Sequence, residues 1–354
     1  MFKEDKGSIP ETPVEESDKT EADAEERGLV LADEINTLMA KEDLSESEKD
    51  ALTSKIEQLE NLYKSKEQLD REFQDKAVDF IDELFDERAS ANDVAEGLAG
   101  IDTDDAWVIR QALGEADTHS LVLSLAGLDS ESAWKARKSW LEDGNQIAVL
   151  NSLVGIDSDR AREIREKLIN VPNEVGGHLQ SKAMSLAGLD SDEAWAYRER
   201  LLRENMRGMA TSLIGLDTDR AWKIRDGLMT DLNVDTNSII RSMTGLDSDR
   251  AWEMRDIYIN NKAHRGRVAI SLAGLDSERA WEMRQKLMAS GADPNDIAKG
   301  LGGLNSPRAW SLRKKMIINP SVNKGAIARG IYGDWTMVAV RKAKEDKEKG
   351  GKTK

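Results

Sequence analysis

Tryptophan and arginine recur at a fixed spacing along most of this 354-residue chain. An Ala-Trp pair occurs in seven of eight similar segments, with Arg162 at the Trp position of the third, and an Arg follows three residues later in all eight. Rows of indole and guanidinium groups can stack on nucleic-acid bases or hold an extended peptide. The same groups can instead pack as joints between neighbouring units. The joint interpretation is favoured, because a recognition surface usually varies between copies. The residues are Trp107, Trp134, Trp195, Trp222, Trp252, Trp281 and Trp310, with Arg110, Arg137, Arg165, Arg198, Arg225, Arg255, Arg284 and Arg313.

A second row of arginines stands just before the Ala of the last four segments. Because this position falls in the first turn of a predicted helix, it should face solvent. A basic stripe there would suit an acidic peptide, RNA or DNA. The alternative is a surface of salt bridges, because Asp219, Asp249 and Glu278 stand next to these arginines. The candidate ligand-binding stripe comprises Arg220, Arg250, Arg279 and Arg308, with Arg265 and Arg267 nearby.

An Asp precedes each predicted second helix, with Asn305 in the last segment. Successive copies should lie about 10 Å apart if the helices pack at ordinary distances. That is too far for two carboxylates to share a calcium ion, whose oxygen ligands lie about 2.3–2.6 Å away. We therefore expect these residues to support helix ends and to pair with the repeated arginines, rather than to bind metal. The aspartates are Asp102, Asp129, Asp157, Asp190, Asp217, Asp247 and Asp276.

Catalytic motifs are missing from the sequence. There is no cysteine, and His119, His178 and His264 have no repeated partners. Segments typical of nucleophile elbows, zinc proteases, phosphate-binding loops or dinucleotide sites do not occur. The sequence thus predicts a protein that is not an enzyme and has neither a cofactor nor a metal site.

The elements that position these residues form a repeat. Eight copies of a segment such as SLAGLDSESAWKAR return every 27–33 residues, and an eroded ninth copy stands at Ile331 to Arg341. Apolar residues four apart, as in Val94 and Leu98, predict a first helix that ends at a glycine. Ser or Thr then caps a second helix. Because two short helices cannot close a core alone, successive pairs must stack. The prediction is an all-α solenoid of eight, possibly nine, two-helix repeats.

The two ends of the chain differ from the repeats. Residues 1–28 are acidic and predict a disordered tail. Residues 29–90 predict long amphipathic helices, either a helical hairpin that caps the solenoid or a coiled-coil arm, with a capping box at Ser45 and Glu48. The repeat domain should span 91–341, followed by a basic disordered tail over 342–354. Residues 1–90 hold 12 basic and 28 acidic residues and so carry the whole net charge of −16.

These features favour a cytoplasmic scaffold without a membrane-spanning segment. Its most favoured partner is a protein or peptide bound along the repeat surface, and the alternative is nucleic acid bound at the arginine stripe. Specificity would come from the unequal segments between repeats, such as Asn170 to His178. The neutral balance of residues 91–354 argues against a strongly basic nucleic-acid-binding domain. Oligomeric state is not predicted.

Overall fold

The computed structural model describes residues 27, 30, 31, 34, 35, 37–39, 41, 45–62, 64, 66–169, 177–204, 208–230 and 234–351. All regular secondary structure within these residues is helical, which confirms the predicted all-α class. None of the described helices is both long and apolar enough to cross a membrane. Most of the predicted acidic tail and residues 170–176, proposed above for specificity, lie outside the described residues.

The chain divides into two compact units, Met1–Glu72 and Phe73–Lys354. The first holds α2 (Glu46–Leu62) and the start of α3 (Lys66–Asp86). The predicted capping box at the start of α2 is confirmed, because the Ser45 amide donates to the Glu48 carboxylate at 3.0 Å and the Glu48 amide donates to the Ser45 hydroxyl at 3.4 Å. Hydrogen bonds from Lys41 and Ser45 lower the pKa of Glu48 to about 2.

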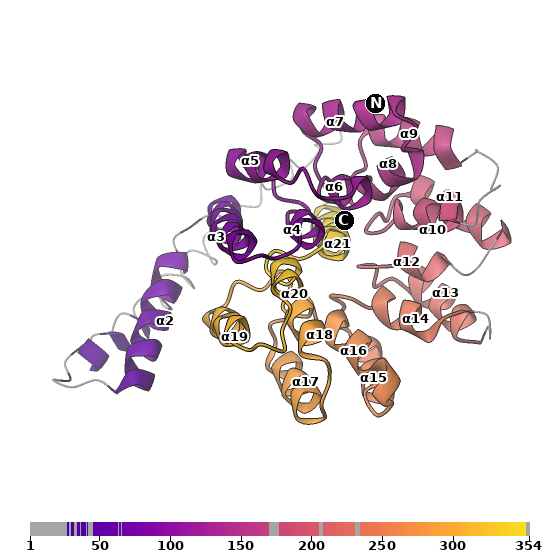
Figure 1. Cartoon of the computed structure of the whole chain (residues 1–354). Helices are drawn as coiled ribbons and strands as arrows, with labels where there is room; N and C mark the ends of the chain where they lie inside the picture. Colours follow the sequence, from indigo (N-terminus) through magenta and orange to yellow (C-terminus); the bar gives the residue numbers. More distant parts are fainter. Residues whose placement is uncertain are drawn as a thin grey trace, which may run out of the picture. The chain divides into compact units, whose positions relative to one another are not determined.

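The second unit is built from an inner and an outer layer of helices (Figure 1). Each predicted first helix is an inner helix. The inner helices are α4 (Ala91–Gly97), α6 (Thr118–Leu123), α8 (Gln146–Ser152), α10 (Gly177–Met184), α12 (Met209–Ser212), α14 (Thr236–Ser242), α16 (Arg265–Ser271), α18 (Pro294–Lys299) and α20 (Lys324–Arg329).

The predicted second helices form the outer layer. Each begins directly after the predicted Ser or Thr cap, and the cap hydroxyl accepts an amide three residues later in several copies, for example Ala106 to Thr103 at 3.3 Å. The outer helices are α5 (Asp104–Ala112), α7 (Glu131–Glu142), α9 (Asp159–Ile169), α11 (Asp192–Glu204), α13 (Asp219–Thr230), α15 (Asp249–Tyr258), α17 (Glu278–Ala289) and α19 (Pro307–Ile317); a short 3-10 turn, η1 (Lys262–His264), precedes α16.

The ends of the repeat array meet. Each inner helix packs on the next, and α20 packs on α4 as closely as on α18, so the second unit is a closed ring. Arg329 of α20 pairs with Asp93 at 2.7 Å and with Glu96 at 3.0 Å, both on α4. Gly97 permits this approach, since a Cβ there would lie 2.9 Å from the Ala328 carbonyl oxygen. A solenoid is predicted by sequence, but its closure depends on the small rotation between units, which the motif does not encode.

The C-terminal part of α3 completes the outer layer beside this junction. Phe80 meets Trp310 edge-on with the ring centroids 5.3 Å apart, and Lys76 lies over the same indole at 4.5 Å. Phe73 contacts Tyr332 at 5.2 Å between centroids. The sequence predicts one helical region over residues 29–90. In the structure this region divides at Phe73, and its last part belongs to the ring unit.

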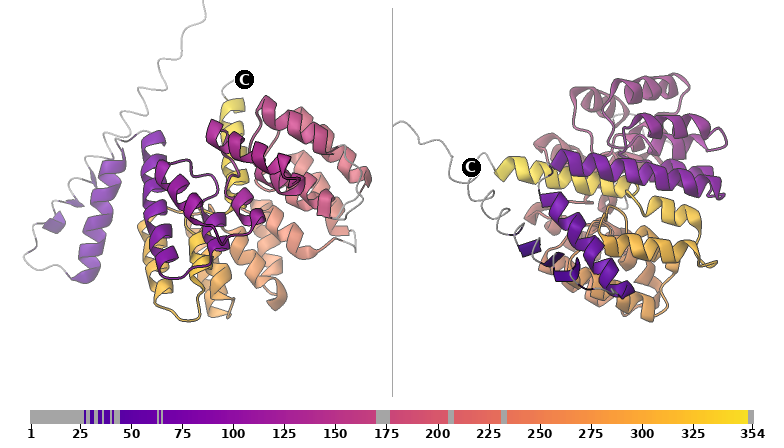
Figure 2. Two further views of the ribbon diagram at one scale, coloured as in Figure 1. Left: turned by 45° about the horizontal axis from the view of Figure 1, so that its top comes forward. Right: turned by 90° about the vertical axis from the view of Figure 1, so that its left-hand side faces the viewer.

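The last helix, α21 (Trp335–Gly351), takes a different course from the outer helices. It runs through the middle of the ring (Figures 1 and 2), where Val338, Ala339 and Val340 are buried. The glycine corner of every unit touches it. Gly188, with φ +80°, approaches the α21 backbone most closely, since a Cβ there would lie 2.4 Å from the Ala339 carbonyl oxygen. Because α21 continues to Gly351, residues 342–351 are helical, which corrects the expectation of a disordered tail there.

Candidate functional site on the outer helices

The repeated tryptophans lie between consecutive outer helices. Six of the seven are buried, with 1–8% of their surface exposed, and Trp107 is half-buried. Each indole Nε1 donates to the side chain five residues earlier, an Asp or Asn305, at 2.6–2.9 Å. The repeated Asp therefore pairs with Trp and not, as the sequence suggested, with the repeated Arg. In four copies the same Asp also accepts the cap hydroxyl of the next unit at 2.9–3.3 Å.

The eight repeated arginines are buried, with 0–7% exposure. Each guanidinium donates to the carbonyl twelve residues earlier at 2.6–2.8 Å, at the end of its own inner helix. It also donates to the last carbonyls of the following inner helix at 2.8–3.1 Å. Helix C-termini have unpaired carbonyls and a negative dipole end, so a cation is stabilised there. Each arginine thus bridges two units.

The bridging arginines remain charged at neutral pH. Burial lowers the pKa of Arg137 and Arg225 to about 9, and that of Arg110 to about 10, with the nearby aspartates opposing the shift. Each guanidinium also lies over the Trp of its own unit where one is present, 4.5–4.9 Å from the ring centroid. This cation–π contact adds attraction in a desolvated setting.

The candidate ligand-binding stripe makes contacts of the same kind. Its four arginines reach back to the preceding unit, and each lies 4.5–4.8 Å from the centroid of that unit's Trp ring. Trp195, Trp222, Trp252 and Trp281 are therefore held between two guanidiniums. The four arginines also pair with carboxylates at 2.5–3.4 Å. Asp249 and Glu278 are among the partners, but each pairs with the arginine of the following unit and not with the adjacent one. The side chains of the four arginines remain 42–48% exposed.

The two remaining stripe residues do not join this row. Arg265 donates to the Ile259 carbonyl at 3.1 Å and to the Ser290 carbonyl at 2.8 Å, so it ties loops of neighbouring units. Arg267 is exposed on α16, an inner helix, away from the outer-helix first turns. Both residues are close to the stripe along the chain, but the fold does not place them in its row.

In the third unit a salt bridge replaces the stacked pair. Arg162 occupies the Trp position and contacts Asp157 at 3.2 Å, as the tryptophans contact their aspartates. Glu193 occupies the stripe position of the next unit and contacts Arg162 at 3.2 Å. The exchange of Trp for Arg is thus matched by an exchange of Arg for Glu, and the inter-unit contact is kept.

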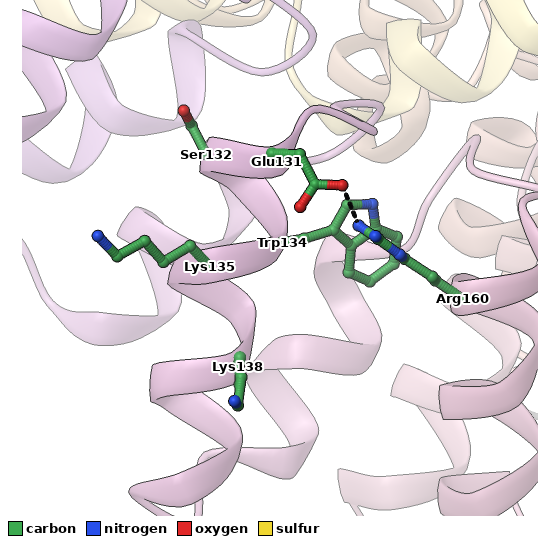
Figure 3. Close-up of a pocket in the computed structure, with 6 residues that line it drawn as sticks. All are labelled: Glu131, Ser132, Trp134, Lys135, Lys138 and Arg160. Carbon is green, nitrogen blue, oxygen red and sulfur yellow. Dashed lines mark hydrogen bonds and ion pairs between the residues drawn. The ribbon is translucent and has the colours of Figure 1, made fainter.

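Over Trp134 the stacking scheme is broken. Arg160 occupies the stripe position here, but it pairs with Glu131 at 2.5 Å (Figure 3), and among the described residues no arginine of the next unit stacks on this indole. A groove of about 610 Å³ results, lined by Glu131, Ser132, Trp134, Lys135, Lys138 and Arg160. Sequence reasoning missed this groove, because the carboxylate that pairs with Arg160 belongs to the preceding unit and lies 29 residues earlier in the chain.

The histidines do not form a site in the described part of the chain. His119 is exposed, and His264 contacts Asn237 at 3.1 Å and packs against Tyr258. The side chain of His178 lies outside the described residues. No group of three or more metal-binding side chains occurs within the described residues.

Comparison with known proteins does not place the chain in a family. No protein-family model matches it, and neither the curated proteins nor the solved structures include a significant match.

Proposed function

We propose that the protein is a non-enzymatic scaffold of nine helical units that binds another protein on its outer helices. The observation that carries this proposal is the exposure of large apolar side chains in the outer layer. Val108 on α5 is 64% exposed, Ile257 on α15 is 63% exposed, and Ile318 at the end of α19 is 82% exposed. Exposed large apolar side chains of this kind can be covered when another protein binds.

In this scaffold, the tryptophans and bridging arginines connect neighbouring units and do not contact the partner. Their hydrogen bonds end on groups within the ring, so they hold the outer helices in fixed positions. A rigid array presents a preorganised surface, which lowers the entropic cost of binding. The nucleic-acid alternative is less favoured, because the four aligned stripe arginines already pair with carboxylates.

Affinity capture from the native host, with and without nuclease, tests the proposal. The bait is the full chain, compared with a variant carrying Ile257→Glu and Ile318→Glu. A matched control carries Lys223→Glu and Lys286→Glu, which change charge without removing an exposed apolar group. We expect nuclease-resistant protein partners that are retained by the control and lost by the apolar variant. Partners that vanish after nuclease treatment, or that the apolar variant retains, would overturn the proposal.

A further inference from the structure

Trp134 is the one buried repeat Trp of the described ring on which neither an arginine of the following unit nor a side chain of α3 stacks. Trp134 is 8% exposed, compared with 1–4% for the tryptophans held between two arginines. Trp134 is the aromatic side chain among the residues that line the groove (Figure 3). An aromatic floor of this kind can hold an apolar side chain of a partner.

The rim of the groove is basic. Lys135, Lys138 and Arg160 all line the groove. In Figure 3, Arg160 extends from α9 toward Trp134, whereas Lys135 extends from the opposite side of α7. Glu131 neutralises Arg160, whereas the contact of Lys138 with Glu142 is long, at 4.0 Å. Lys138 is 80% exposed and Arg160 is 57% exposed, so both can reach a ligand. The groove therefore combines an apolar floor with a net positive rim, in a chain whose net charge is −16.

We propose that this groove binds an acidic peptide segment of the partner protein. An apolar side chain of the segment rests on Trp134, and its carboxylates face Lys135, Lys138 and Arg160. The inference rests on the proposed scaffold function and gives its partner a chemical class. Nucleic acid fits less well, because Glu131 lies within the groove and a phosphate backbone is bound by longer rows of cations.

Selection from a library of random twelve-residue peptides tests this assignment. The bait is the full chain, and the variant carries Lys135→Glu and Lys138→Glu, both on exposed side chains. The matched control is Lys223→Glu, because Lys223 is the equivalent of Lys135 in a unit whose Trp222 is covered by Arg250. Thermal unfolding of each variant confirms that the ring is intact. Dissociation constants of the enriched peptides are then measured by fluorescence anisotropy at 50 and 200 mM salt.

We expect the enriched peptides to be acidic with at least one large apolar residue. Reversal of both lysines should weaken their binding at least tenfold, Lys223→Glu should change it less than twofold, and higher salt should weaken it. Enriched peptides that lack acidic residues, or that bind the double variant equally well, would overturn the groove assignment and leave the scaffold proposal standing. A single-stranded oligonucleotide that displaces the peptides and binds more tightly would overturn the assignment in favour of nucleic acid. Failure to enrich any peptide would also overturn it, whereas the scaffold proposal is decided separately by the capture experiment.

Discussion

Replacement of one bridging arginine measures what holds two units together. Arg225 is fully buried and donates to the Leu213 carbonyl at 2.8 Å, the Ser242 carbonyl at 2.9 Å and the Ser242 hydroxyl at 3.0 Å. Arg225→Met keeps most of the aliphatic stem and removes these donors. Each of these three buried acceptors loses a charged donor, at a cost of about 1–3 kcal/mol, whereas the charge itself no longer has to be desolvated. We expect a net loss of about 3–5 kcal/mol in the free energy of unfolding.

This loss corresponds to a lower melting temperature by about 5–8 °C, given about 2.1 cal/mol/K of unfolding entropy per residue in a unit of about 280 residues. The assay is thermal and urea unfolding followed by circular dichroism. Arg250→Met is the matched control, because Arg250 also stacks on Trp222 but is 47% exposed and pairs with the half-exposed Asp226. Its expected cost is below about 1 kcal/mol. Equal losses for the two variants would refute the view that the bridging arginines join the units.

Three further predictions concern the corners, the central helix and the exchanged pair. Gly188→Ala should lower the free energy of unfolding in urea by about 2 kcal/mol more than Gly144→Ala does. Both glycines have φ near +80°, but only a Cβ at 188 meets the Ala339 carbonyl. Equal losses would count against close packing on α21. Deletion of residues 335–354 should expose Ala126, Val154 and Ile214 and increase binding of a hydrophobic dye, whereas deletion of 344–354 should not; unchanged dye binding after the longer deletion would show that α21 is dispensable. Arg162→Trp combined with Glu193→Arg should rebuild the stacked pair, with a favourable coupling energy of about 0.5–2 kcal/mol in a double-mutant cycle. A coupling energy of zero would show that the side chains at 162 and 193 do not interact.

The sequence predicts the repeat unit well because its signals are local. Glycine corners, Ser or Thr caps and apolar residues four apart each act within one helix pair, and the caps and corners occur in the structure where the motif places them. The stacking of the repeated Arg on the repeated Trp also follows from their spacing of three, which places both on one helical face.

Contacts between residues far apart in the chain could not be predicted from these local signals. Ring closure through Arg329 and Asp93 joins positions more than two hundred residues apart, and neither residue belongs to the repeated motif. The course of α21 was missed because Trp335 and Val338 read as an eroded ninth copy rather than as a central helix. The pairing of Asp with Trp was missed because charge suggested Arg as the partner, whereas the guanidinium is used by helix-end carbonyls.

Closure of the ring is the claim on which the fixed outer surface depends, and a disulfide across the junction tests it most directly. The chain contains no cysteine, so Asp93→Cys with Gly325→Cys introduces one pair across the junction. A Cβ at 325 would lie 2.5 Å from the Cβ at 93, so α20 and α4 must separate by about 1–2 Å to reach the Cβ–Cβ spacing of about 3.5–4.5 Å found in disulfides. On mild oxidation at low protein concentration, the account predicts nearly complete formation of the 93–325 disulfide, seen as faster migration on a non-reducing gel and as one linked peptide by mass spectrometry. A chain that stays reduced, or that forms only intermolecular disulfides, would contradict a closed ring.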